Sequence, residues 1–182
     1  MSEEIQKPRP KHVEVPFWAN IFKKKETQKS DIINILEKIP LFSSLGMREI
    51  RKMSLIVYER NYQAGEFLFK EGNPGAGMFI IKSGAVAIER VLESGESTRL
   101  TTLTTGDFFG ELSLMNDAPR TASAKCNKNT TVLIFFRQDL FDIIEREPHL
   151  GSKILIELAK MLGDRLTESN TALLALKKEM EK

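Results

Sequence analysis

Eight of the eleven glycines in this 182-residue chain fall between positions 65 and 110. The runs between them are short and rich in aromatic and β-branched residues, as at 67–69, 78–81, 85–88 and 99–103. Turn residues at spacings of about ten positions, between runs of strand-forming residues, are typical of an antiparallel sandwich or barrel. A last run of this kind, 130–136, would close the barrel. We therefore predict an antiparallel β-roll in the middle of the chain.

The hydrophobic period becomes helical on both sides of this region. Before it, residues 30–39 begin with the capping pair Ser30-Asp31 and stop at Pro40, and a second helix should start after residue 44. After it, residues 138–145 and a long element from Pro148 onward have helical patterns. The predicted fold class is α+β, a jelly-roll-like β-roll flanked by N-terminal helices and a long C-terminal helix. The predicted division is a polar extension at 1–29, a β-roll with its helical lead-in at 30–147, and a lid and dimerisation helix at 148–182.

The long C-terminal element has apolar residues alternating at spacings of four and three, which is the pattern of a helix-helix seam. The seam consists of Leu155, Ala159, Leu162, Leu166, Ser169, Leu173, Leu176 and Met180. A helix of about thirty residues spans roughly 45 Å, which is longer than a small barrel is wide. We therefore predict a homodimer formed through this helix, with the polar Ser169 fixing the register or touching a ligand.

The first 29 residues contain seven Lys or Arg and four Glu and are mostly polar. One segment differs, since Phe17, Trp18, Ile21 and Phe22 share a helical face and Lys23-Lys24-Lys25 follow. Two interpretations stay open: the segment docks on a membrane surface or a partner, or its aromatic residues pack on their own domain or a second subunit.

Composition excludes several classes of protein. The single cysteine, Cys126, rules out an internal disulfide and a thiolate metal site held by this chain alone, and the two histidines add little as ligands. The net charge of +2 does not by itself indicate nucleic acid. No apolar run is long enough for a membrane span and no secretory signal begins the chain, so we expect a cytoplasmic protein.

The segment 106–124 carries the chemistry. Gly110 lets the backbone pass close to a ligand, and residues 111–115 can form one helical turn whose free N–H groups attract an anion. Arg120 supplies a forked cation suited to two phosphate oxygens. Glu111 only accepts hydrogen bonds, so it needs a donor such as a sugar hydroxyl. Together they indicate a ligand with a singly charged phosphate and a ribose.

This chain resembles the cyclic nucleotide-binding domain family over roughly residues 38–170. The resemblance is carried by 39–42, Gly65-Glu66, Gly72, Gly84, Phe109-Gly110-Glu111-Leu112 and Pro119-Arg120-Thr121-Ala122. It implies that Glu111 accepts the ribose 2′-OH, that Arg120 pairs with the cyclic phosphate, and that backbone N–H groups of Leu112, Ser113 and Thr121 complete the cradle. It also implies that Ile88 and Leu100 line the base and sugar.

Residues 164–170 resemble the corresponding helix of bacterial catabolite activator proteins, in which two polar residues at the dimer seam reach the adenine edge. Ser169 and Asn170 occupy those places, and Arg165 would approach the phosphate or ribose side. The alternative is a hydrated break in a coiled coil.

We predict a receptor for a cyclic nucleotide, cAMP before cGMP, that signals through an unknown effector protein. Thr121 does not settle the base, since the family places Thr there in binders of both nucleotides. No helix-turn-helix follows the long helix, so we expect no direct DNA binding. Ser113 has no nearby histidine, so we expect no catalysis and no cofactor or metal. The alternative is a non-binding module of the same fold that scaffolds a partner or a membrane surface.

Overall fold

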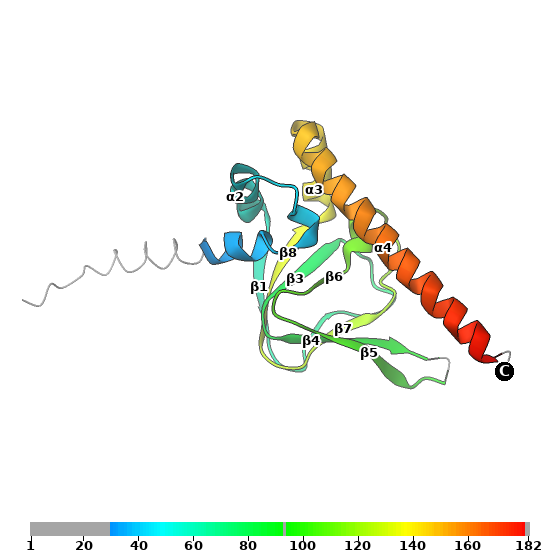
Figure 1. The fold of residues 1–182 in the computed structure, drawn as a ribbon. Helices are drawn as coiled ribbons and strands as arrows, with labels where there is room; N and C mark the ends of the chain where they lie inside the picture. Colours follow the sequence, from blue (N-terminus) through cyan, green and yellow to red (C-terminus); the bar gives the residue numbers. More distant parts are fainter. Residues whose placement is uncertain (1–29, 93, 181–182) are drawn as a thin grey trace, which may run out of the picture.

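The computed structural model describes residues 30–92 and 94–180, which form two antiparallel sheets and a group of helices (Figure 1). The first sheet has the order β1 (Tyr58–Tyr62), β8 (Thr130–Phe136), β3 (Gly77–Ser83) and β6 (Phe108–Phe109). The second has the order β2 (Phe67–Phe69), β7 (Ser123–Cys126), β4 (Ala85–Val91) and β5 (Ser97–Thr104). This arrangement confirms the predicted α+β fold with an antiparallel roll.

The two sheets share one hydrophobic core. Side chains from both sheets meet in it, for example Ile81 and Val132 from the first sheet and Val86 and Ala124 from the second, and all four are fully buried. Alternate residues of a strand point to the same face of its sheet, so these buried side chains line the inside of the roll. The strand-forming runs seen in the sequence therefore form the walls of the roll. The predicted runs 67–69 and 130–136 coincide with β2 and β8.

The helices pack at one end of the roll around a second core. They are a helix over residues 30–36, the short 3₁₀ helix η1 (Pro40–Phe42), α2 (Met47–Ile56), η2 (Glu111–Leu114), α3 (Arg137–Arg146) and α4 (Pro148–Met180). The first helix ends three residues before the predicted position, because Ile39 precedes Pro40 and is held extended. Ser30, the first described residue, is already helical, so the predicted N-cap at Ser30-Asp31 lies at the boundary of the described residues.

Helix α4 runs past the roll and leaves its second half uncovered (Figure 1). Its buried residues are Leu150, Gly151, Ile154 and Leu158, and every residue from 163 to 180 is exposed. Among the exposed residues are Leu166 and Leu173, which belong to the predicted seam. The expectation that the roll is too small to cover this helix is confirmed.

The division into segments 1–29, 30–147 and 148–182 stays a prediction. The aromatic and basic segment 17–25 lies outside the described residues. None of the described helices is long and apolar enough to cross a membrane.

The substitution of glycine by alanine should have opposite effects on stability at the two glycines of α4. A Cβ at Gly151 would stand 2.8 Å from the Cα of Ile144 in α3, whereas a Cβ at Gly163 would meet nothing within 4 Å. Gly151→Ala should therefore lower the free energy of unfolding by about 1–3 kcal/mol through overpacking. Gly163→Ala should raise it by up to about 1 kcal/mol, because alanine favours the helix. Urea denaturation of both variants measures the difference, and shifts of the same sign would contradict the close α3–α4 contact.

Candidate functional site

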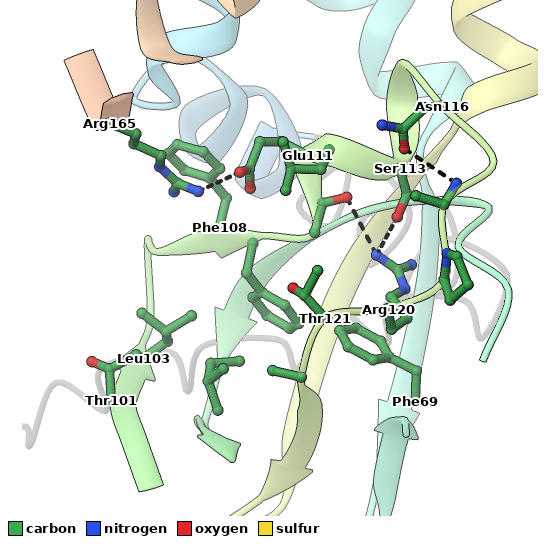
Figure 2. Close-up of a pocket in the computed structure, with 17 residues that line it drawn as sticks. Phe69, Thr101, Leu103, Phe108, Glu111, Ser113, Asn116, Arg120, Thr121 and Arg165 are labelled. Atoms are coloured by element: carbon green, nitrogen blue, oxygen red, sulfur yellow. Dashed lines mark hydrogen bonds and ion pairs between the residues drawn. The ribbon is translucent and has the colours of Figure 1, made fainter. Parts of the chain in front are cut away.

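A cavity of about 550 Å³ opens between the roll and α4. Its walls come from strands β2, β4, β5 and β6, from the loop 109–122 that contains η2, and from Arg165 of α4 (Figure 2). The volume is in the range of small-molecule sites, and the wall is mainly apolar with a few polar groups.

Arg120 is the buried cation of this cavity. Its Nη1 donates to Ser113 Oγ at 2.8 Å and to the carbonyl of Gly110 at 3.3 Å, and its Nη2 donates to the carbonyl of Gly77 at 2.7 Å. Burial lowers the pKa of the guanidinium, because desolvation disfavours the charged form, while the charge of Glu111 works in the opposite direction. An arginine stays protonated in proteins, so the site holds a positive charge surrounded mainly by neutral acceptors.

Two phenylalanine rings contact the guanidinium from the side of the roll, and a third packs on one of them. Its Cζ lies 4.1 Å from the ring centroid of Phe69 and 5.5 Å from that of Phe79. Phe109 stacks on Phe79 with 5.4 Å between the ring centroids. Cation–π contacts of this kind favour a desolvated cation, and they fix where an anion would be bound.

Glycine is required at two points around Arg120. Gly110 has a φ of +77°, and a Cβ there would stand 2.5 Å from Nη1 of Arg120. At Gly75 a Cβ would stand 2.1 Å from the Ser113 hydroxyl that accepts from Arg120. The loop can therefore close on the guanidinium only with glycine at both positions.

Glu111 lies at the same cavity with only 3% of its surface exposed. Its Oε1 accepts a hydrogen bond from Nη1 of Arg165, whose guanidinium also lies 5.7 Å from the ring of Phe108. Among the described residues, Glu111 alone bonds to the side chain of Arg165. The ion pair therefore connects the otherwise uncovered half of α4 to the loop.

Three buried side-chain polar atoms have no partner among the described residues: Glu111 Oε2, Arg120 Nε and Asp139 Oδ2. The first two belong to residues that line the cavity. Buried polar atoms are normally hydrogen-bonded, so such a pair is unusual. The carboxylate oxygen can only accept a hydrogen bond and the guanidinium nitrogen can only donate one. The cavity thus offers a place for an anion and, beside it, a place for a hydroxyl donor.

Backbone donors lie next to Arg120. The N–H groups of Thr121 and Ala122 donate to no described acceptor. Within the described ranges, no group of three or more His, Cys, Asp or Glu could hold a metal ion. The groups that the site presents, a guanidinium, a carboxylate and backbone N–H donors, can form hydrogen bonds and charge pairs.

Comparison with known proteins agrees with this geometry. Residues 59–147 match the cyclic nucleotide-binding domain. The chain is 32% identical over 134 residues to the cyclic AMP receptor protein of Thermus thermophilus, covering 74% of this chain and 60% of that protein. It is 35% identical over 95 residues to a cGMP-dependent protein kinase of Caenorhabditis briggsae, covering 52% of this chain and 13% of the kinase.

A solved cyclic nucleotide-binding domain from Methylobacillus flagellatus superposes with a TM-score of 0.70 at 26% identity, covering 82% of this chain and 84% of that one. The chain therefore contains a cyclic nucleotide-binding domain, over residues 59–147. It spans less than two thirds of the length of the two curated relatives named above.

Most residues predicted for the binding domain line the cavity. These are Ile88, Phe109, Gly110, Glu111, Leu112, Ser113, Arg120, Thr121, Ala122 and Arg165. Leu100 does not line it, and 57% of its side chain is exposed. The strand register explains this, because Ile88 pairs with Thr101 and Glu89 pairs with Arg99, which leaves Leu100 as the extra residue of a β-bulge.

Ser169 and Asn170 do not line the cavity of this cyclic nucleotide-binding domain either. Both lie on the exposed half of α4, beyond Arg165. The wall also contains residues that were not predicted to bind the ligand: Phe69, Thr101, Leu103, Phe108, Asn116, Ala118 and Pro119. Strand alternation could have found Thr101 and Leu103, which are two positions apart on β5.

The Glu111–Arg165 pair predicts a local effect on α4. Arg165→Met should speed amide hydrogen exchange in residues 163–175 about tenfold, because a charged hydrogen bond contributes roughly 1.5–3 kcal/mol and this side chain is half in water. Lys160→Met is the matched control, since Lys160 pairs only with Glu157 of its own helix. Equal exchange rates in the parent and in Arg165→Met would show that the pair does not hold the helix.

Proposed function

We propose that this chain is a cytoplasmic cyclic nucleotide receptor that prefers cAMP and acts through contact with an effector protein. The observation that carries the proposal is the pair of buried, unpartnered atoms, Glu111 Oε2 and Arg120 Nε, in one cavity. A cyclic nucleotide supplies what both atoms need, because it has one anionic phosphate and a ribose 2′-OH that donates a hydrogen bond.

The phosphate binds at Arg120. The free Nε and the adjacent N–H groups of Thr121 and Ala122 donate to its oxygens, together with N–H groups of Leu112 and Ser113. Several donors to one anion give both affinity and orientation. The phenylalanine rings behind the guanidinium keep it in place before the ligand arrives, which reduces the ordering cost of binding.

The ribose and base extend from there toward α4. The ribose 2′-OH donates to Oε2 of Glu111, while Oε1 keeps Arg165. The base lies in the apolar part of the cavity, against Ile88, Leu103 and Phe108. The named relatives include a cyclic AMP receptor and a cGMP-dependent kinase, and the greater coverage of the receptor supports cAMP as the first choice.

The exposed half of α4 supplies the lid and the dimer contact in this proposal. Two copies of the helix pair through the seam, and Ser169 and Asn170 then reach the base of the bound nucleotide. Because Glu111 contacts both the ribose and Arg165, binding shifts the position of α4 between two states. An effector protein binds α4 in one of these two positions.

The ligand proposal predicts selective thermal stabilisation and a specific loss of affinity. cAMP should raise the melting temperature in a concentration-dependent way, more than cGMP does and unlike linear AMP. In calorimetry Arg120→Lys should bind cAMP at least tenfold more weakly, because lysine keeps the charge but loses the fork, and a buried charged partner contributes roughly 2–5 kcal/mol. Arg90→Lys, on the exposed side of β4, is the matched control and should bind like the parent.

Two results would contradict the ligand proposal. A folded parent protein that binds neither cyclic nucleotide at millimolar concentration would not be a receptor. Equal affinities of the parent and Arg120→Lys would remove Arg120 from phosphate binding. Circular dichroism of each variant shows that the protein is folded before affinity is compared.

The dimer proposal predicts that Leu173 contributes more to dimerisation than its neighbour Leu174. Leu173 lies on the seam and is 52% exposed, while Leu174 lies one position off the seam and is 60% exposed. In sedimentation equilibrium, Leu173→Glu should weaken dimerisation at least tenfold, because the charge would be buried against a second apolar helix. Leu174→Glu should change it less. A parent protein that stays monomeric at high concentration would argue against this interface.

A further inference from the structure

Helix α2 has an outer face that the cyclic nucleotide site does not use. Its inner side is buried through Ile50, Met53 and Ser54. Its outer side carries two apolar and three cationic side chains, all exposed: Met47, Arg48, Arg51, Lys52 and Leu55. At 3.6 residues per turn these five positions lie within an arc of about 140° that contains no acid. We call these five residues the α2 face.

The charges of the α2 face are largely uncompensated. Arg48 and Arg51 form no ion pair with any acid in the described ranges, and Lys52 pairs with the exposed Glu147. The one acid of α2 in its first turns, Glu49, is turned to the other side and binds Lys153 of α4. Leu55 lies between the two arginines around the helix and 71% of its surface is exposed. Cations around an exposed leucine indicate a partner that is both anionic and apolar.

The basic and aromatic segment 17–25 is within reach of the same region. The helix over residues 30–36 packs in one core with α2, so the chain leaves the domain beside that helix. The eight steps along the chain from Phe22 to Ser30 span at most roughly 26–29 Å. However, Lys23, Lys24 and Lys25 would repel Arg48 and Arg51 if the segment covered the α2 face. Like charges therefore favour a shared anionic partner over an internal contact.

We propose that the α2 face docks on an anionic lipid surface, with the segment 17–25 binding the same surface. Basic side chains bind acidic headgroups, and leucine, methionine and the aromatic residues of the segment insert at the interface. A lipid surface needs no matched shape, which suits a convex helix with single exposed apolar residues. The cations of both parts add, so each one removed should weaken binding about fivefold at low salt.

The test is sedimentation of the full chain with lipid vesicles. The chain should sediment with phosphatidylcholine vesicles that contain phosphatidylserine and stay in the supernatant with pure phosphatidylcholine. Arg48→Gln/Arg51→Gln should weaken the binding at least tenfold, and Leu55→Gln should weaken it severalfold with no change in charge. Arg90→Gln/Arg99→Gln, on the β4–β5 hairpin, changes the net charge equally and should bind within about twofold of the parent.

Several outcomes would overturn the proposal. The first is that the parent does not bind acidic vesicles. The second is that Arg48→Gln/Arg51→Gln and Arg90→Gln/Arg99→Gln lose the same affinity for these vesicles. The third is that Arg48→Gln/Arg51→Gln and Leu55→Gln both bind as tightly as the parent. Phe17→Ser/Trp18→Ser should also bind less. If Phe17→Ser/Trp18→Ser bound vesicles more strongly than the parent, the segment 17–25 would cover the α2 face instead. If the α2-face variants changed the sedimentation coefficient without vesicles, a second copy of the chain would cover that face. Because cAMP calorimetry on the same variants is unaffected by lipid, failure here is distinguishable from failure of the receptor proposal.

Discussion

The site is organised around a buried cation that has no acid bonded to it. Arg120 gives its hydrogen bonds to two carbonyls and one hydroxyl, and it lies against phenylalanine rings. Neutral acceptors orient a guanidinium but do not neutralise it, so the desolvation cost of the charge is only partly offset. An anion that reaches Nε gains from this imbalance. The glycines around the site and the stacked rings are needed because the guanidinium must be held in place without a counter-charge.

The acid that could have paired with Arg120 is used elsewhere. Glu111 bonds to Arg165 of α4, and the loop is also connected to α3 through an ion pair between Asp117 and Arg137. The loop 109–122 is therefore held by charge pairs to two helices on one side. On the other side it is held by the backbone contacts of Pro119 and Arg120 with residues 72–74. The carboxylate of Glu111 has two oxygens: Oε1 accepts from Arg165, and Oε2 is free for the proposed ligand, so one group would link ligand binding to α4.

The sequence predicted the kinds of groups in the site better than their places. The presence of Glu111 and Arg120 at one cavity follows from their residue types and from the glycine before Glu111. The exclusion of Leu100 does not, because a bulge shifts the side chains by one position and only the pairing with β4 reveals it. The phenylalanine rings that contact Arg120 could not be predicted from the sequence either, because Phe69 and Phe79 lie on different sheets. The helical pattern predicted one long element, which is α4, but not its division into a buried and an exposed half, because burial stops where the contacts of α4 with the roll stop.

Helix α2 and the cavity contact different parts of α4. Ile50 and Met53 of α2 share a core with Ile154 and Leu158, in the buried half of that helix. Packed cores move as units, so α2 and this half form one rigid block. The exposed half is joined to the loop through Arg165, and a motion started at Glu111 acts there. The ion pairs between α2 and the α3–α4 region are partly exposed and contribute at most about 1 kcal/mol each. The proposed docking on lipid and the proposed closure of α4 over a nucleotide therefore require no exchange of energy through α2. In these proposals the α2 face is a fixed anchor beside a movable lid.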